Sequence, residues 1–221
     1  MPNGLSREQM AQRAAQELQH GFTVNLGIGI PTLVANYVPP GVEIILHAQN
    51  GVLGCGPLAA DGAEDPDLIN AGAQYITLRP GACCFDSALS FAMIRGGHLD
   101  MTILGGLQVS AQGDLANWKI PSREYGSIGG AMDLVSGAKR VIVTMEHCTK
   151  HGAPKLLAQC TYPLTGVACV DLVITDLAVV AITPAGFVLQ EVAPGLTVAE
   201  VQRLTGAPLR IADDVHDIRL M

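Results

Sequence analysis

Residues 22–47, FTVNLGIGIPTLVANYVPPGVEIILH, contain the pattern that decides the fold class. An apolar run over residues 22–26 is typical of a strand, and the glycine turn after it contains Pro31, which suits the first turn of a helix. The Pro-Pro-Gly of residues 39–41 is expected to stop this short helix. A second apolar run over residues 43–47 then predicts a strand, so the stretch predicts a strand–helix–strand unit of an α/β protein.

The same alternation continues on both sides. Residues 5–20 predict a helix with Ser6 and Gln9 as a capping box, and residues 49–57, rich in glycine and asparagine, predict a loop. Further expected elements are strands at 75–78, 99–104, 140–145 and 170–175, a helix at 87–95 capped by Asp86, a hairpin at 178–192 and a helix at 197–204. This order predicts an α/β fold with a largely parallel central sheet, helices on both faces and an antiparallel edge, in one domain that comprises residues 1–221.

The composition is that of an acidic globular protein. The 221 residues include 13 Lys and Arg against 20 Asp and Glu, and 49% are hydrophobic. Only 15% are charged, so we expect partner chains to cover part of the surface in an obligate oligomer. The sequence shows no basic stripe for nucleic acid, no apolar run long enough for a membrane and no apolar signal core in residues 1–13. We therefore expect a cytoplasmic protein that binds neither nucleic acid nor membranes.

Several common catalytic motifs are absent. Gly27 and Gly29 begin a dinucleotide fingerprint, but Thr32 stands where a third glycine is required. His147 and His151 have the spacing of two metal ligands on a helix, but the glycine and proline after them favour a polar loop, and we expect no metal site. The six cysteines contain no C-x-x-C pair, so we expect free thiols buried as small hydrophobic side chains.

Residues 46–54, LHAQNGVLG, resemble the active-site segment of the B subunit of family I CoA-transferases, the 3-oxoacid CoA-transferases. The resemblance extends over nearly the whole chain. It includes VNLGIGIPT at residues 24–32, LINAG at 68–72, RGGHLD at 95–100, DLANW at 114–118 and GGAMDLV at 129–135. Residues 64–70 and 160–166 are most similar to the 3-oxoadipate branch.

The resemblance implies the B subunit of an A/B enzyme, often of A2B2 stoichiometry, that moves CoA from succinyl-CoA or acetyl-CoA to a 3-oxo acid. It implies no metal or redox cofactor. In that family a glutamate attacks the thioester, and the acyl anhydride that forms is converted to an enzyme–CoA thioester. The chain shows no counterpart of the A half's glycine-rich CoA-binding signature, so we expect a separate A subunit to be its partner.

By this resemblance, Gln49 stands at the position of the family's glutamate and Ala48 at that of the serine before it. A carboxamide is uncharged and a poor nucleophile, so Gln49 should prevent covalent turnover. Because Gln and Glu are nearly isosteric, the fold, the CoA pocket and partner docking should survive. Asn25 and the backbone N–H of Gly130 fall where the family stabilises the thioester oxyanion.

Three more residues, Gly29, Asn50 and Gly51, are candidate substrate-binding residues. The loop that contains Asn50 and Gly51 must let the substrate approach the backbone closely. The residues alone favour structural roles for Asn25, as a turn cap, and for Gly130, as a helix start, and the resemblance reverses this preference. Asn50 and Gly51 can also serve simply as a turn. Glu146 would be a substitute nucleophile only if the fold brought it to Gln49, and nothing in the sequence does.

Three functions therefore stay open. The first is a CoA-transferase B subunit with Gln49 in the nucleophile's place. The second is a hydrolase or lyase of the same fold that uses water or substrate-assisted chemistry on a CoA ester. The third is a subunit that binds a CoA ester or stabilises its partner without turnover. Thioester exchange, release of free CoA and binding without product would distinguish them.

Overall fold

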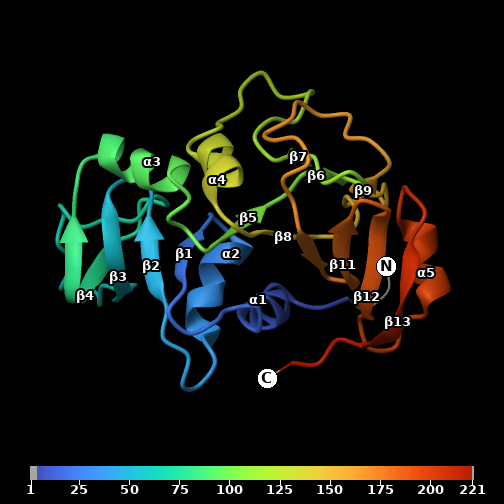
Figure 1. The fold of residues 1–221 in the computed structure, drawn as a ribbon, viewed down its shortest axis with the longest axis horizontal. Helices are drawn as coiled ribbons and strands as arrows, with labels where there is room; N and C mark the ends of the chain where they lie inside the picture. The colour runs from blue at the N-terminus through green and yellow to red at the C-terminus, as the bar shows by residue number, and fades with distance from the viewer. Residues whose placement is uncertain (1–3, 221) are drawn as a thin grey trace.

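Figure 1 shows the protein as a computed structural model that describes residues 4–220. Two sheets organise the chain. The strands of the larger sheet are β1 (Thr23–Leu26), β2 (Ile45–Ala48), β3 (Val52–Leu58), β4 (Ile76–Cys84), β5 (Met101–Gly105), β8 (Val141–Met145), β10 (Leu172–Thr175), β11 (Ala178–Thr183), β12 (Gly186–Val192) and β13 (Arg210–Asp217). The smaller sheet contains β6 (Gln108–Ser110), β7 (Leu115–Ala116) and β9 (Leu156–Leu157).

The ten-stranded sheet has the order β13-β12-β11-β10-β8-β5-β1-β2-β3-β4. Its centre, from β10 to β2, is parallel throughout. Antiparallel pairs extend it on both sides, with β3 and β4 beyond β2 and the β11–β12 hairpin beyond β10. The predicted parallel sheet with an antiparallel edge is therefore confirmed, and the parallel centre places the C-terminal ends of β1, β2 and β5 at one edge.

Helices cover both faces of the sheet, as predicted (Figure 1). They are α1 (Arg7–Ala15), α2 (Ile30–Leu33), the 3₁₀ helix η1 (Val34–Tyr37), α3 (Ser87–Arg95), α4 (Ala131–Gly137) and α5 (Val198–Leu204). Side chains alternate along β8, so that Ile142 belongs to the core beneath α1 and α2, and Val143 to the core beneath α3, α4 and α5. No helix within residues 4–220 is long and apolar enough to cross a membrane.

The first helix begins where the sequence predicts and ends earlier. Ser6 and Gln9 form the expected capping box, and Ser6 Oγ accepts the Gln9 N–H at 3.2 Å. The α-helix ends at Ala15 instead of His20, because Glu17 and Leu18 donate to carbonyls three residues earlier and tighten the chain into turns.

The prediction of a loop over residues 49–57 is wrong, since β3 occupies most of it. Gln49, Asn50 and Gly51 form a tight turn after β2, and Gly51 has a φ of 124° that favours glycine. The glycines of β3 let β4 approach closely, and a Cβ at Gly54 would lie 2.9 Å from the Ala82 Cβ. Because glycine has a low strand propensity, the sequence did not predict this strand, which is stabilised by close packing against β4.

Other differences concern the edges of the sheet. The strand expected at 75–78 continues to Cys84 through Pro80, which an edge strand tolerates. The strands β6, β7, β9 and β13 were not predicted. All six cysteines are free as expected, but only Cys55 is buried. Cys83 and Cys84 are exposed, because β4 is an edge strand and only part of it is covered, and the other three are partly buried. The assignment of residues 1–221 to one domain stays a prediction.

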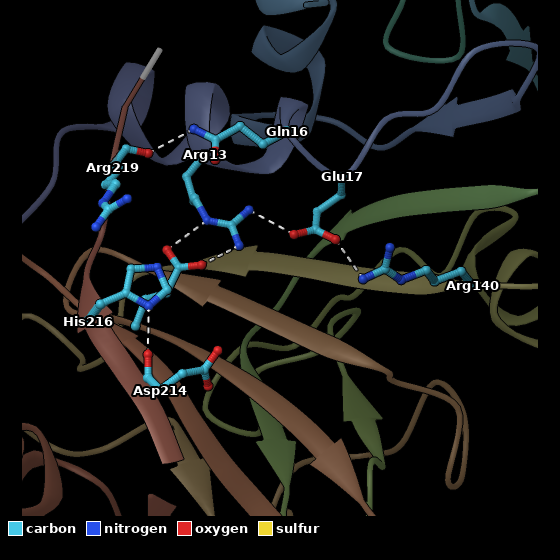
Figure 2. Close-up of polar contacts among 8 residues, drawn as sticks. Arg13, Gln16, Glu17, Arg140, Asp214, His216 and Arg219 are labelled. Atoms are coloured by element: carbon cyan, nitrogen blue, oxygen red, sulfur yellow. Dashed lines mark hydrogen bonds and ion pairs between the residues drawn. The ribbon is translucent and has the colours of Figure 1, made fainter. Parts of the chain in front are cut away.

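A buried ion-pair network joins α1 to β12 and to the residue before β8 (Figure 2). Arg13 donates from Nε and Nη2 to the two carboxylate oxygens of Glu191 on β12, at 2.8 and 2.6 Å. Its Nη1 donates to Glu17 at 2.7 Å, and Glu17 also accepts from Arg140, just before β8, at 2.6 Å. Arg13 and Glu191 are both buried, so each charge depends on the other for compensation.

Replacing Arg13 should therefore destabilise the protein strongly. We expect Arg13→Met to lower the free energy of unfolding by about 3 kcal/mol, because Glu191 would stay buried without its partner. Urea denaturation measures the change. Arg95→Met is the matched control, since Arg95 pairs with Asp133 but its side chain is 68% exposed, and it should cost less than about 1 kcal/mol. Equal losses in both variants would contradict this account of the network.

Candidate active site

A cavity of about 410 Å³ opens at the C-terminal ends of β1, β2 and β5, beside the start of α4. This is where open α/β sheets bind ligands. Gln49 reaches it from the turn after β2, and Gly130 from the N-terminal end of α4. Most of the remaining lining comes from three segments, namely residues 26–28 at the end of β1, residues 104–107 at the end of β5, and residues 127–131, and Ala71, Asn117 and Leu134 complete it. Two of the three predicted catalytic positions, Gln49 and Gly130, thus line one cavity.

The third predicted position, Asn25, lies directly behind Gln49. Its side chain is fully buried, and its Nδ2 lies 3.2 Å from Gln49 Oε1, to which it donates. Asn25 Nδ2 also donates to the carbonyl oxygen of His47 at 3.0 Å. Because Gln49 uses Oε1 as the acceptor, a carboxylate oxygen at the same place would accept the same hydrogen bond.

Gly130, at the N-terminal end of α4, lies beside the Gln49 side chain. A Cβ at residue 130 would lie 3.4 Å from Gln49 Cγ and 3.0 Å from the Phe91 ring. Within the described part of the chain, the Gly130 N–H makes no hydrogen bond. A glycine therefore keeps this wall of the cavity open and leaves a backbone donor available beside residue 49.

The three candidate substrate-binding residues do not line this cavity. Gly29 caps α2 with a φ of 94°, and Asn50 is exposed, where its Nδ2 donates to the Ile69 carbonyl at 2.7 Å. Gly51 is buried, and a Cβ there would lie 2.0 Å from the Phe85 carbonyl oxygen. In this chain Asn50 holds the loop after β3 in place, and Gly51 permits close packing of the turn. Substrate contact by the three residues stays a prediction.

The cavity is uncharged. Its lining, taken over residues 4–220, consists of aliphatic side chains and glycines with three polar side chains, those of Gln49, Asn117 and Ser127. Asn117 is held by Thr165 and by the Gly105 carbonyl, so its orientation is fixed. The cavity therefore suits a neutral acyl or thioester group, while an anionic group bound here would find no cation in this lining.

Two residues behind Asn25 escaped sequence analysis. His47, 4% exposed, lies on β2 with its Nδ1 3.1 Å from Asn25 Nδ2, and its Nε2 lies 3.0 Å from the Oγ of Ser90 on α3. The His47 ring also stacks on Phe85, with 6.4 Å between ring centroids. Burial lowers the pKa of His47 to about 4, so the ring is neutral near pH 7. No motif links Ser90 to His47, because 43 residues separate them.

In the segment that follows β8, the His147 side chain is bonded within the protein. His147 is buried between the hydroxyls of Thr175 and Thr205, at 2.9 and 2.8 Å. No group of three His, Cys, Asp or Glu suited to a metal occurs among residues 4–220. Glu146 lies 3.6 Å from Lys155 and lines a second cavity of about 510 Å³ that does not include Gln49. Glu146 is therefore no substitute nucleophile at residue 49.

The two buried histidines predict acid sensitivity. Burial lowers the pKa of both His47 and His147 to about 4, below the ordinary value of about 6.5 that the unfolded chain should have. The unfolded state then binds more protons between these values, so stability should be constant above pH 6.5 and fall as the pH falls towards 4. The slope should be about 1.4 kcal/mol per pH unit for each histidine.

Urea midpoints at pH 7, 6 and 5 measure this slope. His147→Gln should remove about half of it, while His216→Gln, at an exposed position, should leave it unchanged. A stability that stays constant from pH 7 to pH 5 would contradict the prediction.

The sequences of known proteins define the class to which this site belongs. The family model described as Coenzyme A transferase matches residues 7–204, and the chain belongs to that family. It is 53% identical over 210 residues to the B subunit of a probable succinyl-CoA:3-ketoacid coenzyme A transferase of Bacillus subtilis, with 95% of this chain and 97% of the relative covered. It is 52% identical over 206 residues to the B subunit of the 3-oxoadipate CoA-transferase of Acinetobacter baylyi, with 93% and 95% covered. The predicted family, enzyme class and subunit type are confirmed.

Solved structures show the same fold. The acyl-CoA transferase YdiF of Escherichia coli O157:H7 matches with a TM-score of 0.78 at 21% identity, over 99% of this chain and 44% of that one. The decarboxylase AibA/AibB matches with a TM-score of 0.67 at 17% identity, over 97% and 89%. At these identities the likeness concerns the fold alone.

Proposed function

We propose that this chain and a separate A subunit form a 3-oxoacid CoA-transferase, which moves CoA from succinyl-CoA or acetyl-CoA to a 3-oxo acid. The relatives described as 3-oxoadipate and succinyl-CoA:3-ketoacid transferases support this substrate class. The CoA thioester is a substrate, and the reaction requires no metal or redox cofactor. A cytoplasmic location stays a prediction.

The main support is the arrangement around residue 49. An oxygen acceptor at this position lies at the cavity wall, 3.2 Å from a fully buried amide donor, and beside a glycine whose N–H has no acceptor in the described chain. A glutamate carboxylate fits this place without any change of backbone. The Asn25 amide would orient it, and the Gly130 N–H would stabilise the negative charge that develops on the thioester oxygen.

The proposed chemistry uses residue 49 twice. A carboxylate at this position attacks the thioester carbonyl, and the CoA thiolate leaves as an acyl-glutamyl anhydride forms. The thiolate then attacks the glutamyl carbonyl, which releases the donor acid and leaves a glutamyl–CoA thioester. The acceptor carboxylate repeats both steps in reverse. Gln49 can begin neither step, because its carboxamide is uncharged, so the chain with Gln49 should bind substrate and transfer CoA slowly or not at all.

The A subunit completes the site in this proposal. Both substrates are anions, yet the described lining of the cavity holds no charged side chain, and the chain as a whole carries a net charge of −7. A carboxylate that reaches residue 49 therefore needs a cation from another chain. Burial of part of the uncharged surface in an A2B2 assembly is consistent with the low fraction of charged residues, 15%.

The test is to coexpress the chain with the A subunit of a 3-oxoacid CoA-transferase, with and without Gln49→Glu. The complexes are mixed with succinyl-CoA and acetoacetate or 3-oxoadipate, and all acyl-CoA products are measured. We expect copurification with the A subunit, and we expect the Gln49→Glu complex to form the 3-oxoacyl-CoA, while the chain alone forms none. Full activity of the chain alone, or no product from either complex, would overturn the proposal.

Gln49 itself favours a second candidate, namely CoA-ester chemistry without a covalent enzyme intermediate. One solved structure with this fold is described as a decarboxylase, and the likeness to it concerns the fold alone. In the same assay, release of free CoA or of CO₂ by the Gln49 complex would support a hydrolase or lyase. Substrate binding without any product would support a binding subunit.

A further inference from the structure

A buried chain of polar groups lies behind residue 49 and leads away from the cavity. It connects Gln49 on the turn after β2, Asn25 on β1, His47 on β2 and Ser90 on α3. Asn25 and Ser90 are fully buried, and His47 is 4% exposed. Neither His47 nor Ser90 lines the cavity, so neither has a direct role in the proposed chemistry.

We propose that His47 and Ser90 are positioning residues that set the direction of the Asn25 amide, so that its N–H group, and not its oxygen, faces the reacting side chain at position 49. This inference rests on the proposed function, because it takes residue 49 as the place of the nucleophile. It adds two residues that act through Asn25 and do not touch substrate.

The donors and acceptors around Asn25 fix which way the amide points. Three acceptor atoms surround its Nδ2: His47 Nδ1 at 3.1 Å, His47 O at 3.0 Å and Gln49 Oε1 at 3.2 Å. A half-turn of the amide would bring Oδ1 against these atoms, two of which are oxygens. The observed orientation instead leaves Oδ1 buried and without a partner in the described chain. An unpartnered oxygen is destabilising, so the three acceptors must favour this orientation by more than that cost.

The same bonds assign the proton on the His47 ring. Because Asn25 Nδ2 can only donate, His47 Nδ1 must accept, and the proton of a neutral ring then sits on Nε2. Nε2–H points to the Oγ of Ser90, which accepts it. In the other tautomer, an Nδ1–H would face the Asn25 Nδ2–H group. The Asn25 donor therefore requires the Nε2–H tautomer, and Ser90 stabilises that tautomer by accepting its proton.

Two properties of the surroundings keep the ring in this state. Burial lowers the pKa of His47, so no charged form competes near neutral pH. The nearly parallel stacking on Phe85, at an interplanar angle of 19°, limits rotation of the ring. The carboxylate or oxyanion at residue 49 consequently meets a donor that needs no reorganisation during the reaction, which is the property that makes such donors effective.

The activity test compares Ser90→Ala and His47→Phe in the complex of the Gln49→Glu chain with the A subunit. Each should lower kcat for CoA transfer about 10-fold and change KM less than about 2-fold, since neither residue contacts the substrate. Thr144→Val is the matched control, because the Thr144 hydroxyl is also buried but has no partner in the described chain, and it should leave kcat unchanged. A kcat in Ser90→Ala and His47→Phe equal to that in Thr144→Val would overturn the proposal.

A second measurement does not depend on activity. Nitrogen-15 NMR of the full chain should show His47 protonated at Nε2 at pH 7, and Ser90→Ala should shift this population towards Nδ1. An Nδ1–H ring in the unmodified chain would overturn the positioning role even if CoA transfer is found. Conversely, the expected tautomer together with an inactive Gln49→Glu complex would place the failure in the proposed function.

Discussion

Gln49→Glu should raise the rate of CoA transfer by the complex with the A subunit on the order of 10⁴-fold or more, the scale of effect seen when a covalent nucleophile is removed or restored. The expected gain is large because the surroundings are already complete. Asn25 Nδ2 donates to the atom that a carboxylate oxygen would replace, and Gly130 leaves both space and an N–H beside it. The substitution changes one amide group to a carboxylate and leaves the packing of residue 49 nearly the same.

Two further variants at this position distinguish the effect of the negative charge from the effect of where the carboxylate lies. Gln49→Met keeps the length of the side chain without charge and should be as inactive as Gln49. Gln49→Asp supplies the charge about one methylene short of the Asn25 amide and should restore little. Kinetics of 3-oxoacyl-CoA formation measure the three variants beside the unmodified chain. If the chain with Gln49 transfers CoA as fast as Gln49→Glu, the nucleophile lies elsewhere.

Gly51→Ala should destabilise the protein on the order of 4 kcal/mol or prevent its folding. Two costs combine: a backbone with a φ of 124°, which side chains rarely adopt, and a Cβ placed 2.0 Å from the Phe85 carbonyl oxygen. That carbonyl belongs to the backbone and cannot move independently, since the Phe85 N–H donates to the Gly51 carbonyl at 2.9 Å. The turn that carries Gln49 would then shift away from Asn25.

Urea denaturation and the yield of soluble protein measure this effect. Gly62→Ala is the control, because Gly62 has a φ of 81° but nothing lies within 4 Å of its added Cβ. Gly62→Ala should lower the free energy of unfolding by about 1 kcal/mol, because only the backbone conformation is unfavourable and no atom clashes with the added Cβ. If Gly51→Ala is as stable as Gly62→Ala, the close approach at Phe85 does not constrain the turn.

The central part of the fold could be predicted because its signals are local. The strands β1 and β2 are short apolar runs with a proline-started helix between them. Asp86 caps α3 as expected, and α5 begins one residue after its predicted start. The strands β3 and β4 were missed or shortened because their sequences contain glycine and proline, and their stability depends on packing between the two strands. A propensity of single residues cannot represent such a long-range contact.

In the candidate site, too, some residues could be found from the sequence and others depend on long-range contacts. Gln49, Asn25 and Gly130 were selected by resemblance to a family, and the structure brings them together from three separate elements. Gly51 was expected to contact substrate, yet its visible role is to permit packing against Phe85. His47 and Ser90 had no signal at all, because the hydrogen bond between them joins residues 43 positions apart.

The most direct test of the account is to look for CoA covalently bound at residue 49. The Gln49→Glu complex with the A subunit is incubated with succinyl-CoA alone and digested, and the peptide that contains residue 49 is analysed by mass spectrometry, with the Gln49 complex in parallel. We predict a CoA thioester on the introduced glutamate that disappears when the 3-oxo acid is added, and no adduct on Gln49. Catalytic transfer by the Gln49→Glu complex with no adduct at residue 49, or with an adduct on another residue, would contradict the claim that the nucleophile is the side chain at residue 49.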